Sequence, residues 1–85
     1  MNEAQGVKVR LFAVARQLAG VDFLEVALPP QANVSELRAA MAQACPALAP
    51  VLPHALFSVN AEYASEGTLI PPAAELACIP PVSGG

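Results

Sequence analysis

The chain has 85 residues, a length that suits one small domain with a single modest core and no deep pocket of its own. Apolar residues make up 55% of it, and seven acidic residues against four basic ones give a net charge of −3. No basic run is present to collect phosphates, and no apolar stretch approaches the roughly 20 residues of a membrane-spanning helix. We therefore expect a cytoplasmic protein that binds neither nucleic acid nor membranes and is not a self-sufficient enzyme.

The two cysteines and the one histidine form no metal-binding pattern. Cys45 and Cys78 lie far apart in the sequence without a CxxC motif, whereas zinc sites have closely spaced ligands. In a reducing compartment, both are expected to be small buried apolar side chains rather than a disulfide or a reactive thiol. His54 has no acid or nucleophile near it in sequence, so we expect a loop histidine and no metal site.

The first third of the chain predicts two strands that form a hairpin. Apolar and polar residues alternate over 7–14, which is typical of a strand, and the far end of this run is apolar on both faces. A short turn or helical turn at 15–20 leads to a second strand at 23–28. Pro29-Pro30 ends this strand, because neither proline can donate a hydrogen bond to a neighbouring strand.

An amphipathic helix follows the hairpin. Asn33 can cap its N-terminus, and Glu36 stands three residues further on, as in an Asn variant of the capping box. Spacings of three and four relate its apolar residues, Val34, Leu37, Met41, Ala44 and Leu48. The helix is expected to end near Pro46, since proline interrupts helical hydrogen bonding.

The last part of the chain predicts short strands joined by turns. An irregular stretch at 50–53 precedes a third strand at 56–60, in which Phe57 is expected in the core. A turn leads to a short strand around Tyr63, whose role the pattern leaves open. The final strand is expected at 75–79.

This order of elements predicts an α+β fold in which one main helix packs on one face of a mixed sheet. The β-grasp of ubiquitin satisfies the order, although the pattern alone leaves other α+β folds open. One domain is expected over 1–85, with a globular body at 6–79 and a tail at 80–85. An exposed apolar patch is expected on the sheet where partners dock, on a face that the pattern does not specify.

The tail differs in character from the body. Pro80 and Pro81 fix φ near −65° and favour an extended stalk, and the six residues of the tail can span up to roughly 20 Å. Gly84 and Gly85 have no Cβ, so another protein could close a narrow channel around the terminal carboxylate. Such an end suits chemistry carried out by a partner.

Three segments together resemble the molybdopterin synthase small subunit family of ubiquitin-like sulfur carriers. They are Val7-Lys8-Val9-Arg10-Leu11-Phe12-Ala13 with Ala15-Arg16-Gln17-Leu18-Ala19-Gly20, then Leu56-Phe57-Ser58-Val59-Asn60, and the ending Ile79-Pro80-Pro81-Val82-Ser83-Gly84-Gly85. The resemblance runs from about Val7 to Gly85, and its most specific part is the ending. The chain departs from the family at two places: Ala73-Ala74 stand where Gly-Asp is common, and Cys78 where an aromatic residue is frequent.

The resemblance implies a non-catalytic sulfur donor that binds no cofactor itself. In the family, an E1-like enzyme uses ATP and magnesium to adenylate the terminal glycine, here Gly85, and sulfur from a persulfide enzyme converts it to a thiocarboxylate. A large catalytic subunit then transfers this sulfur to a cyclic pterin precursor of the molybdenum cofactor. Two small and two large chains form the implied assembly.

Partner contacts are expected from the tail and from one arginine of the body: Pro80, Pro81, Val82, Ser83, Gly84 and Arg16. Other functions stay open. A sulfur carrier for thiamine or a sulfur-containing amino acid would share the thiocarboxylate, and a ubiquitin-like modifier would join Gly85 to lysines of target proteins. A plain binding module with an incidental tail ranks last.

Overall fold

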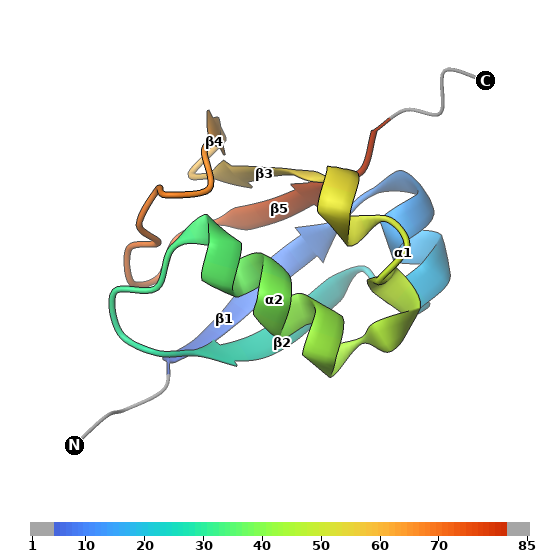
Figure 1. Ribbon diagram of the computed structural model, residues 1–85, viewed down its shortest axis with the longest axis horizontal. Coiled ribbons are helices and arrows are strands. Elements are labelled where there is room, and N and C mark those ends of the chain that lie inside the picture. Colours follow the sequence, from blue (N-terminus) through green and yellow to red (C-terminus); the bar gives the residue numbers. More distant parts are fainter. Residues whose placement is uncertain (1–4, 82–85) are drawn as a thin grey trace.

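The computed structural model describes residues 5–81 and contains five strands, two α-helices and two short 3₁₀ helices in this part of the chain (Figure 1). In chain order they are β1 (Gln5–Leu11), α1 (Ala13–Ala19), β2 (Phe23–Leu28), α2 (Val34–Ala44), η1 (Pro46–Leu48), η2 (Leu52–His54), β3 (Leu56–Val59), β4 (Glu62–Ala64) and β5 (Leu76–Ile79). Neither α-helix is long or apolar enough to cross a membrane, and the same holds for every other helix described.

All five strands form one sheet in the order β2-β1-β5-β3-β4. β1 and β2 are antiparallel, which confirms the predicted hairpin, and β4 is antiparallel to β3 at the other edge. β5 lies in the centre, parallel to β1 and antiparallel to β3. Helix α2 covers one face of this mixed sheet (Figure 1), so the predicted β-grasp fold is confirmed.

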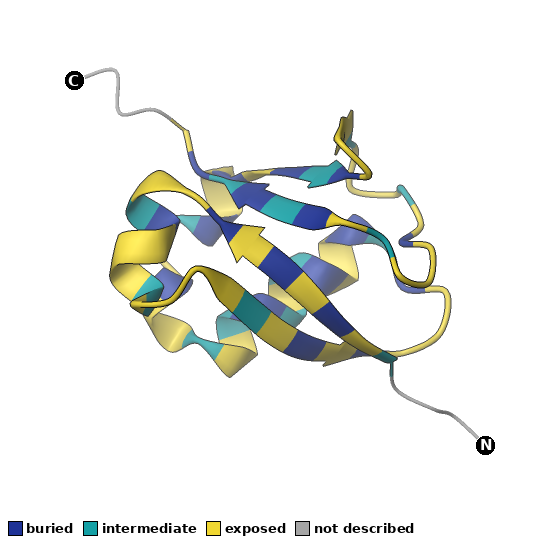
Figure 2. Ribbon diagram, turned by 180° about the vertical axis from the view of Figure 1, so that it is seen from behind, coloured by how far each residue is buried: buried dark blue, intermediate teal, exposed yellow. Residues whose placement is uncertain are grey.

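The core lies between the sheet and α2. Buried and exposed residues alternate along β1, and Val7, Val9 and Leu11 face inward (Figure 2). Phe57 of β3 is 1% exposed, as predicted for a core residue. Helix α2 supplies three buried side chains from one face, those of Val34, Leu37 and Met41.

The predicted cap of α2 is confirmed. The Oδ1 atom of Asn33 accepts a hydrogen bond from the backbone N–H of Glu36 at 2.9 Å, and the Oε1 atom of Glu36 accepts one from the N–H of Asn33 at 3.0 Å. The helix ends at Ala44, and Pro46 begins η1, so the buried Leu48 belongs to this 3₁₀ turn and not to α2. The stretch at 50–53, predicted to be irregular, contains the start of η2.

The strand predicted at 7–14 is too long. β1 ends at Leu11, and helix α1 begins at Ala13, where φ is +52°. The turn predicted at 15–20 is therefore part of a seven-residue helix, closed by Gly20 in the left-handed conformation at φ +76°. Phe12 precedes the helix without a side-chain cap, so the sequence carried no capping signal at this start.

Candidate tail-base and outer-face site

The base of the tail is held by the central strand of the sheet. Cys78 of β5 lies opposite Leu11 of β1 on one side and Phe57 of β3 on the other. Pro80, predicted as part of the stalk, is buried, whereas Pro81 is exposed. Of the predicted tail, the structure therefore describes one buried residue and one exposed residue. The predicted site residues at 82–85 lie outside the described residues.

Helix α1 lies at the base of the tail. The backbone N–H of Phe12 donates a 3.3 Å hydrogen bond to the carbonyl oxygen of Cys78, next to the end of β5. Arg16, predicted as a partner contact, lies on α1 with its Nη1 atom 3.7 Å from Oδ1 of Asp22. Both side chains are more than half exposed, so this ion pair is weak, and the Arg16 guanidinium remains open to a partner.

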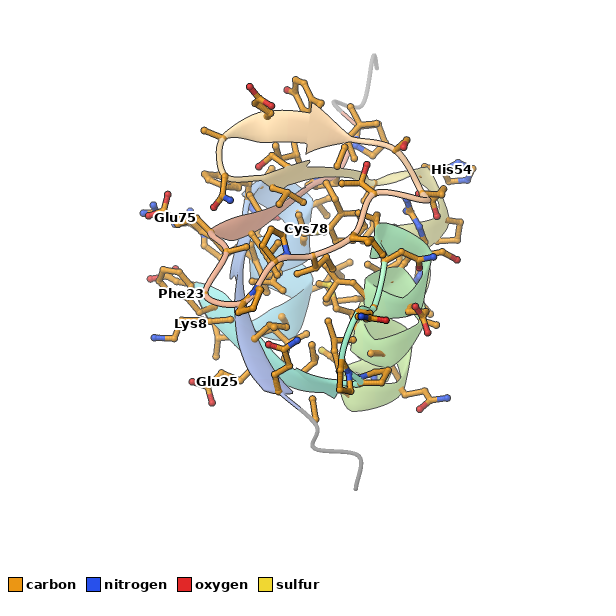
Figure 3. All side chains as sticks on the ribbon, turned by 90° about the vertical axis from the view of Figure 1, so that its left-hand side faces the viewer. Lys8, Phe23, Glu25, His54, Glu75 and Cys78 are labelled. Carbon is orange, nitrogen blue, oxygen red and sulfur yellow. The ribbon has the colours of Figure 1, made fainter. Side chains whose placement is uncertain are left out.

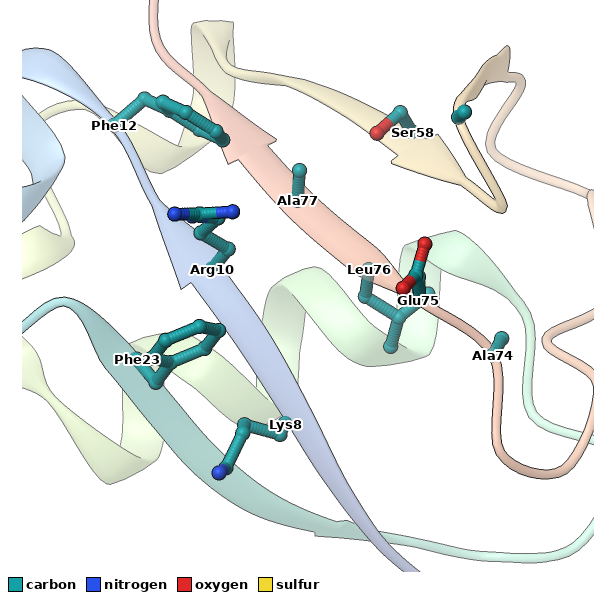
Figure 4. Close-up of a pocket in the computed structure, with 10 residues that line it drawn as sticks. Lys8, Arg10, Phe12, Phe23, Ser58, Ala74, Glu75, Leu76 and Ala77 are labelled. Carbon is teal, nitrogen blue, oxygen red and sulfur yellow. The ribbon is translucent and has the colours of Figure 1, made fainter.

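A shallow hollow lies on the face of the sheet opposite α2, which we call the outer face. The strand register aligns five residues across it, in the order Phe23, Arg10, Ala77, Ser58, Tyr63. The small side chains in the middle of this row leave a hollow of about 510 Å³, lined on its flanks by larger ones (Figure 4).

Cations and aromatic rings meet at one side of the hollow. The guanidinium carbon of Arg10 is 5.5 Å from the ring centroid of Phe12 and 5.6 Å from that of Phe23, and Nζ of Lys8 is 5.1 Å from the Phe23 centroid. Glu75 lines the opposite side, and the sticks of Figure 4 show Arg10 between the two rings. Glu25 lies opposite Lys8 in the strand register. The two ion pairs of residues 5–81, Arg16–Asp22 and Arg38–Glu66, include neither Lys8 nor Arg10.

The outer face is also where an exposed apolar patch lies. Phe12 is 41% exposed, Phe23 44%, Leu56 54% and Tyr63 72%. Leu56 is paired with Ile79, two residues before Pro81, so the patch reaches the base of the tail. The patch predicted from the sequence is therefore present. The alternation along β1 could have shown on which face of the sheet the patch lies. Lys8, Arg10 and Phe12 alternate with the buried valines and therefore point to the opposite face.

Arg38 contrasts with the cations of the outer face. It projects from α2 and donates from Nη1 to the carbonyl oxygens of Leu52 and Ala55, the latter at 2.9 Å. Its Nε atom donates to Oε1 of Glu66 at 3.2 Å, Nη2 bonds the second carboxylate oxygen, and its guanidinium carbon is 4.9 Å from the Phe57 centroid. These bonds lower the pKa of Glu66. Arg38 therefore ties α2 to η2 and to the loop between β4 and β5, and its donors are used within the fold.

The two cysteines lie in different surroundings. Cys78 lies on the core side of β5 (Figure 3), and burial raises its pKa to about 11, so the thiol stays protonated. Cys45 was predicted to be buried and is only partly so: it packs against the edge of the core at the C-cap of α2. His54 is exposed in η2 instead of a loop. Within residues 5–81, no three His, Cys, Asp or Glu side chains gather to hold a metal.

Ala73, which stands where the family commonly has glycine, adopts the left-handed backbone conformation before β5. Ala73 has φ +60°, a conformation that glycine adopts more readily than alanine. After this turn, Oδ1 of Asn60 accepts a 2.9 Å hydrogen bond from the N–H of Glu75, and the Asn60 N–H donates to the Glu75 carbonyl oxygen at 2.8 Å. The β3–β4 turn thus holds the start of the strand that carries the tail.

Comparison with known proteins assigns the chain to a family. The ThiS family matches residues 9–85. A molybdopterin synthase sulfur carrier subunit of Arabidopsis thaliana is 34% identical over 79 residues, which is 93% of this chain and 82% of that protein. The subunit of the same name from Chlamydomonas reinhardtii is 36% identical over 81 residues, 93% of this chain and 98% of that protein. The crystal structure of SAMP1, a small archaeal modifier protein of Haloferax volcanii, aligns with a TM-score of 0.82 and 31% identity, over 95% of this chain and all of that one. The chain therefore belongs to the ThiS family.

Proposed function

We propose that this chain is the sulfur carrier subunit of a molybdopterin synthase, with Gly85 as its reactive end. The observation that carries the proposal is the likeness, over 93% of the chain, to relatives that have this name. The ending Pro80-Pro81-Val82-Ser83-Gly84-Gly85 follows a strand held on both sides, so a partner could draw on the tail without disturbing the core.

The terminal carboxylate must be activated before it can accept sulfur. The α-carboxyl group of a peptide ordinarily has a pKa of about 3.5, so it is anionic at neutral pH and a poor electrophile. An E1-like enzyme joins it to the α-phosphate of ATP, with magnesium bound at that enzyme, and pyrophosphate leaves. The terminal sulfur of a persulfide then attacks the carbonyl carbon, and AMP departs with the electron pair of the C–O bond. A thiol reductant cleaves the remaining S–S bond and leaves a thiocarboxylate on Gly85.

The catalytic groups that use this sulfur belong to a second, larger chain. The tail enters the large subunit, which transfers the sulfur to a cyclic pterin precursor and returns a carboxylate. Gly84 has no side chain, so the tail fits a narrow channel in the large subunit. Two small and two large subunits form the enzyme in the cytoplasm, and the small chain itself holds no cofactor. Three of the residues predicted to contact a partner are described: Pro81 and Arg16, which are exposed, and Pro80, which is buried.

Intact mass of the untagged chain tests this proposal. The chain is incubated with an E1-like adenylyltransferase, MgATP, a persulfide donor and a thiol reductant, and a sample without ATP is the control. The expected result is a mass gain equal to replacing one oxygen by sulfur, mapped to Gly85 and absent without ATP. An unchanged mass, with the same enzyme shown to act on another carrier, would refute the proposal.

A free terminus is a second requirement of this mechanism. Adding one alanine after Gly85 should abolish the mass gain, because the activated carboxylate no longer belongs to the Gly-Gly end. One alanine added before Met1 is the matched control and should leave the gain intact. Thermal unfolding should be the same for both variants. Sulfur transfer by the C-terminally extended chain, without removal of the alanine, would contradict the mechanism.

A protein modifier is the second candidate function, supported by the likeness to SAMP1. In this case Gly85 would form isopeptide bonds with lysine amines of other proteins. The same incubation, supplemented with cell extract, distinguishes the two functions. Lysine-linked adducts without a sulfur-bearing free chain would favour the modifier. A gene for a large synthase subunit beside that of this chain would favour the sulfur carrier.

A further inference from the structure

Three of the four basic residues of the chain lie on or beside the outer face, with acidic residues near them. The chain has a net charge of −3, yet Lys8 and Arg10 both line the large hollow, and Arg16 lines a smaller one of about 200 Å³ beside it. The fourth basic residue, Arg38, is bound by Glu66 and by backbone carbonyls. Arg16 is ion-paired with Asp22, so Lys8 and Arg10 are the basic residues of the described body without an ion pair. Two carboxylates lie on the same face: Glu75 lines the hollow, and Glu25 is opposite Lys8 in the strand register.

The geometry at Arg10 suits a carboxylate. The guanidinium lies near two aromatic rings, which attract its charge but accept none of its N–H donors in conventional hydrogen bonds (Figure 4). No acceptor from residues 5–81 lies within hydrogen-bonding distance of Arg10. The planar guanidinium of Arg10 can therefore donate two parallel hydrogen bonds to a carboxylate. The apolar residues around it suit a carboxylate that stands on an apolar surface.

The hollow and the tail base lie along one strand. Ala77 forms part of the floor of the hollow, and Pro81, the first exposed residue of the tail, is four residues further on. Four residues of extended chain span roughly 13 Å. A protein that receives the tail must come this close to Arg10, so one partner surface could cover both.

We infer that Arg10 on the outer face, with a smaller contribution from Lys8, selects an Asp or Glu side chain on the protein that receives the tail. The inference rests on the proposed function and adds the chemistry of the partner surface to it. Phe12, Phe23 and Leu56 supply the apolar rim of this contact.

Affinity for the purified large subunit of molybdopterin synthase tests the inference. The dissociation constant is measured by calorimetry for the wild-type chain and for Arg10→Gln, Lys8→Gln and Gln43→Glu. Gln43 is exposed on α2, away from the outer face, and Gln43→Glu alters the net charge by the same amount as the two other changes. We expect Arg10→Gln to weaken binding about tenfold or more, Lys8→Gln to weaken it less, and Gln43→Glu to leave it within about twofold.

The salt dependence of binding tests the electrostatic role of Arg10, because a purely structural role would leave this dependence unchanged. Binding of the wild-type chain should weaken more steeply than that of Arg10→Gln as the salt concentration rises from 0.05 to about 0.5 M, because screening removes an attraction that the variant lacks. Unfolding midpoints of all four proteins should agree, since the substituted side chains are exposed.

Two outcomes separate failure of the inference from failure of the proposed function. If the wild-type chain gains sulfur while Arg10→Gln, Lys8→Gln and Gln43→Glu bind the large subunit equally well, the inference is overturned and the function stands. An Arg10→Gln effect on self-association alone, with no change in binding to the large subunit, overturns it equally. If the wild-type chain gains no sulfur, the proposed function fails, and the inference that rests on it fails too.

Discussion

The two faces of the sheet use the same residue types for different ends. On the side covered by α2, Arg38 bonds a carboxylate and two carbonyl oxygens, and Leu37 is fully buried. On the outer face, Arg10 has aromatic neighbours but no acceptor, and Leu56 is 54% exposed. A cation without an acceptor adds little to stability, so the difference separates residues that maintain the fold from residues available to a partner.

A leucine on each face provides the largest expected contrast. Leu37→Ala should lower the free energy of unfolding by about 2–5 kcal/mol, because it leaves a cavity in the core. Leu56→Ala removes the same atoms from a half-exposed site and should cost less than about 1 kcal/mol. Urea denaturation measures both values. Equal losses would mean that the outer face contributes to the core, contrary to the contrast between the two faces.

An arginine on each face provides the next contrast. Arg38→Met keeps a long apolar stem but leaves the Leu52 and Ala55 carbonyls and the Glu66 carboxylate without their donor, which should cost about 1–3 kcal/mol. Arg10→Met should change the free energy of unfolding by less than about 0.5 kcal/mol. Thermal or urea unfolding at neutral pH compares the two variants with the wild type.

The Arg38 contribution should also depend on pH. Because Arg38 lowers the pKa of Glu66 below its ordinary value of 4.5, the unfolded chain takes up this proton first as the pH falls. The stabilisation is thus present above about pH 4.5 and is lost as the pH falls through the folded-state pKa. The difference between wild type and Arg38→Met should shrink from pH 6 to pH 3, and only modestly, since the Glu66 side chain is 57% exposed. A difference that grows toward low pH would contradict this assignment.

The smallest expected effect concerns two residues in the left-handed conformation, Ala73 in the turn before β5 and Gly20 at the C-terminus of α1. Ala73→Gly should raise the free energy of unfolding by about 0.5–1 kcal/mol, because glycine adopts φ +60° without the Cβ penalty of alanine. Gly20→Ala is the reverse change at φ +76°, where an added Cβ has no atom within 4 Å, and it should lower stability by about 1 kcal/mol. Chemical denaturation tests both. Stabilisation by both changes, or by neither, would show that backbone conformation does not control these sites.

Patterns local in sequence predicted the elements that carry their own signals. The capping box at Asn33 and Glu36 located the start of α2, and Pro29-Pro30 located the end of β2. Period-two alternation identified β1. The same alternation places Lys8, Arg10 and Phe12 on one face, the outer face, although Arg10 was not predicted to be a site residue.

Features that depend on distant contacts could not be predicted in this way. Helix α1 has no capping side chain, and apolar residues at 11–15 fit a strand as well as a helix. Its start is decided by the end of β1 pairing, where the Leu11 N–H bonds the carbonyl oxygen of Asp22 and the Phe12 N–H that of Cys78. The hollow likewise needs Ala77 and Ser58, from β5 and β3, to lie beside Arg10.

The central position of β5 has a mechanical consequence for a chain handled by its tail. A pull on the tail acts along the axis of β5, which is hydrogen-bonded to β1 on one side and β3 on the other. In this shear geometry the bonds to both neighbours carry the force together, whereas an edge strand can be peeled away one bond at a time. A partner can therefore pull the tail into a narrow site and release it again without unfolding the domain that carries the tail.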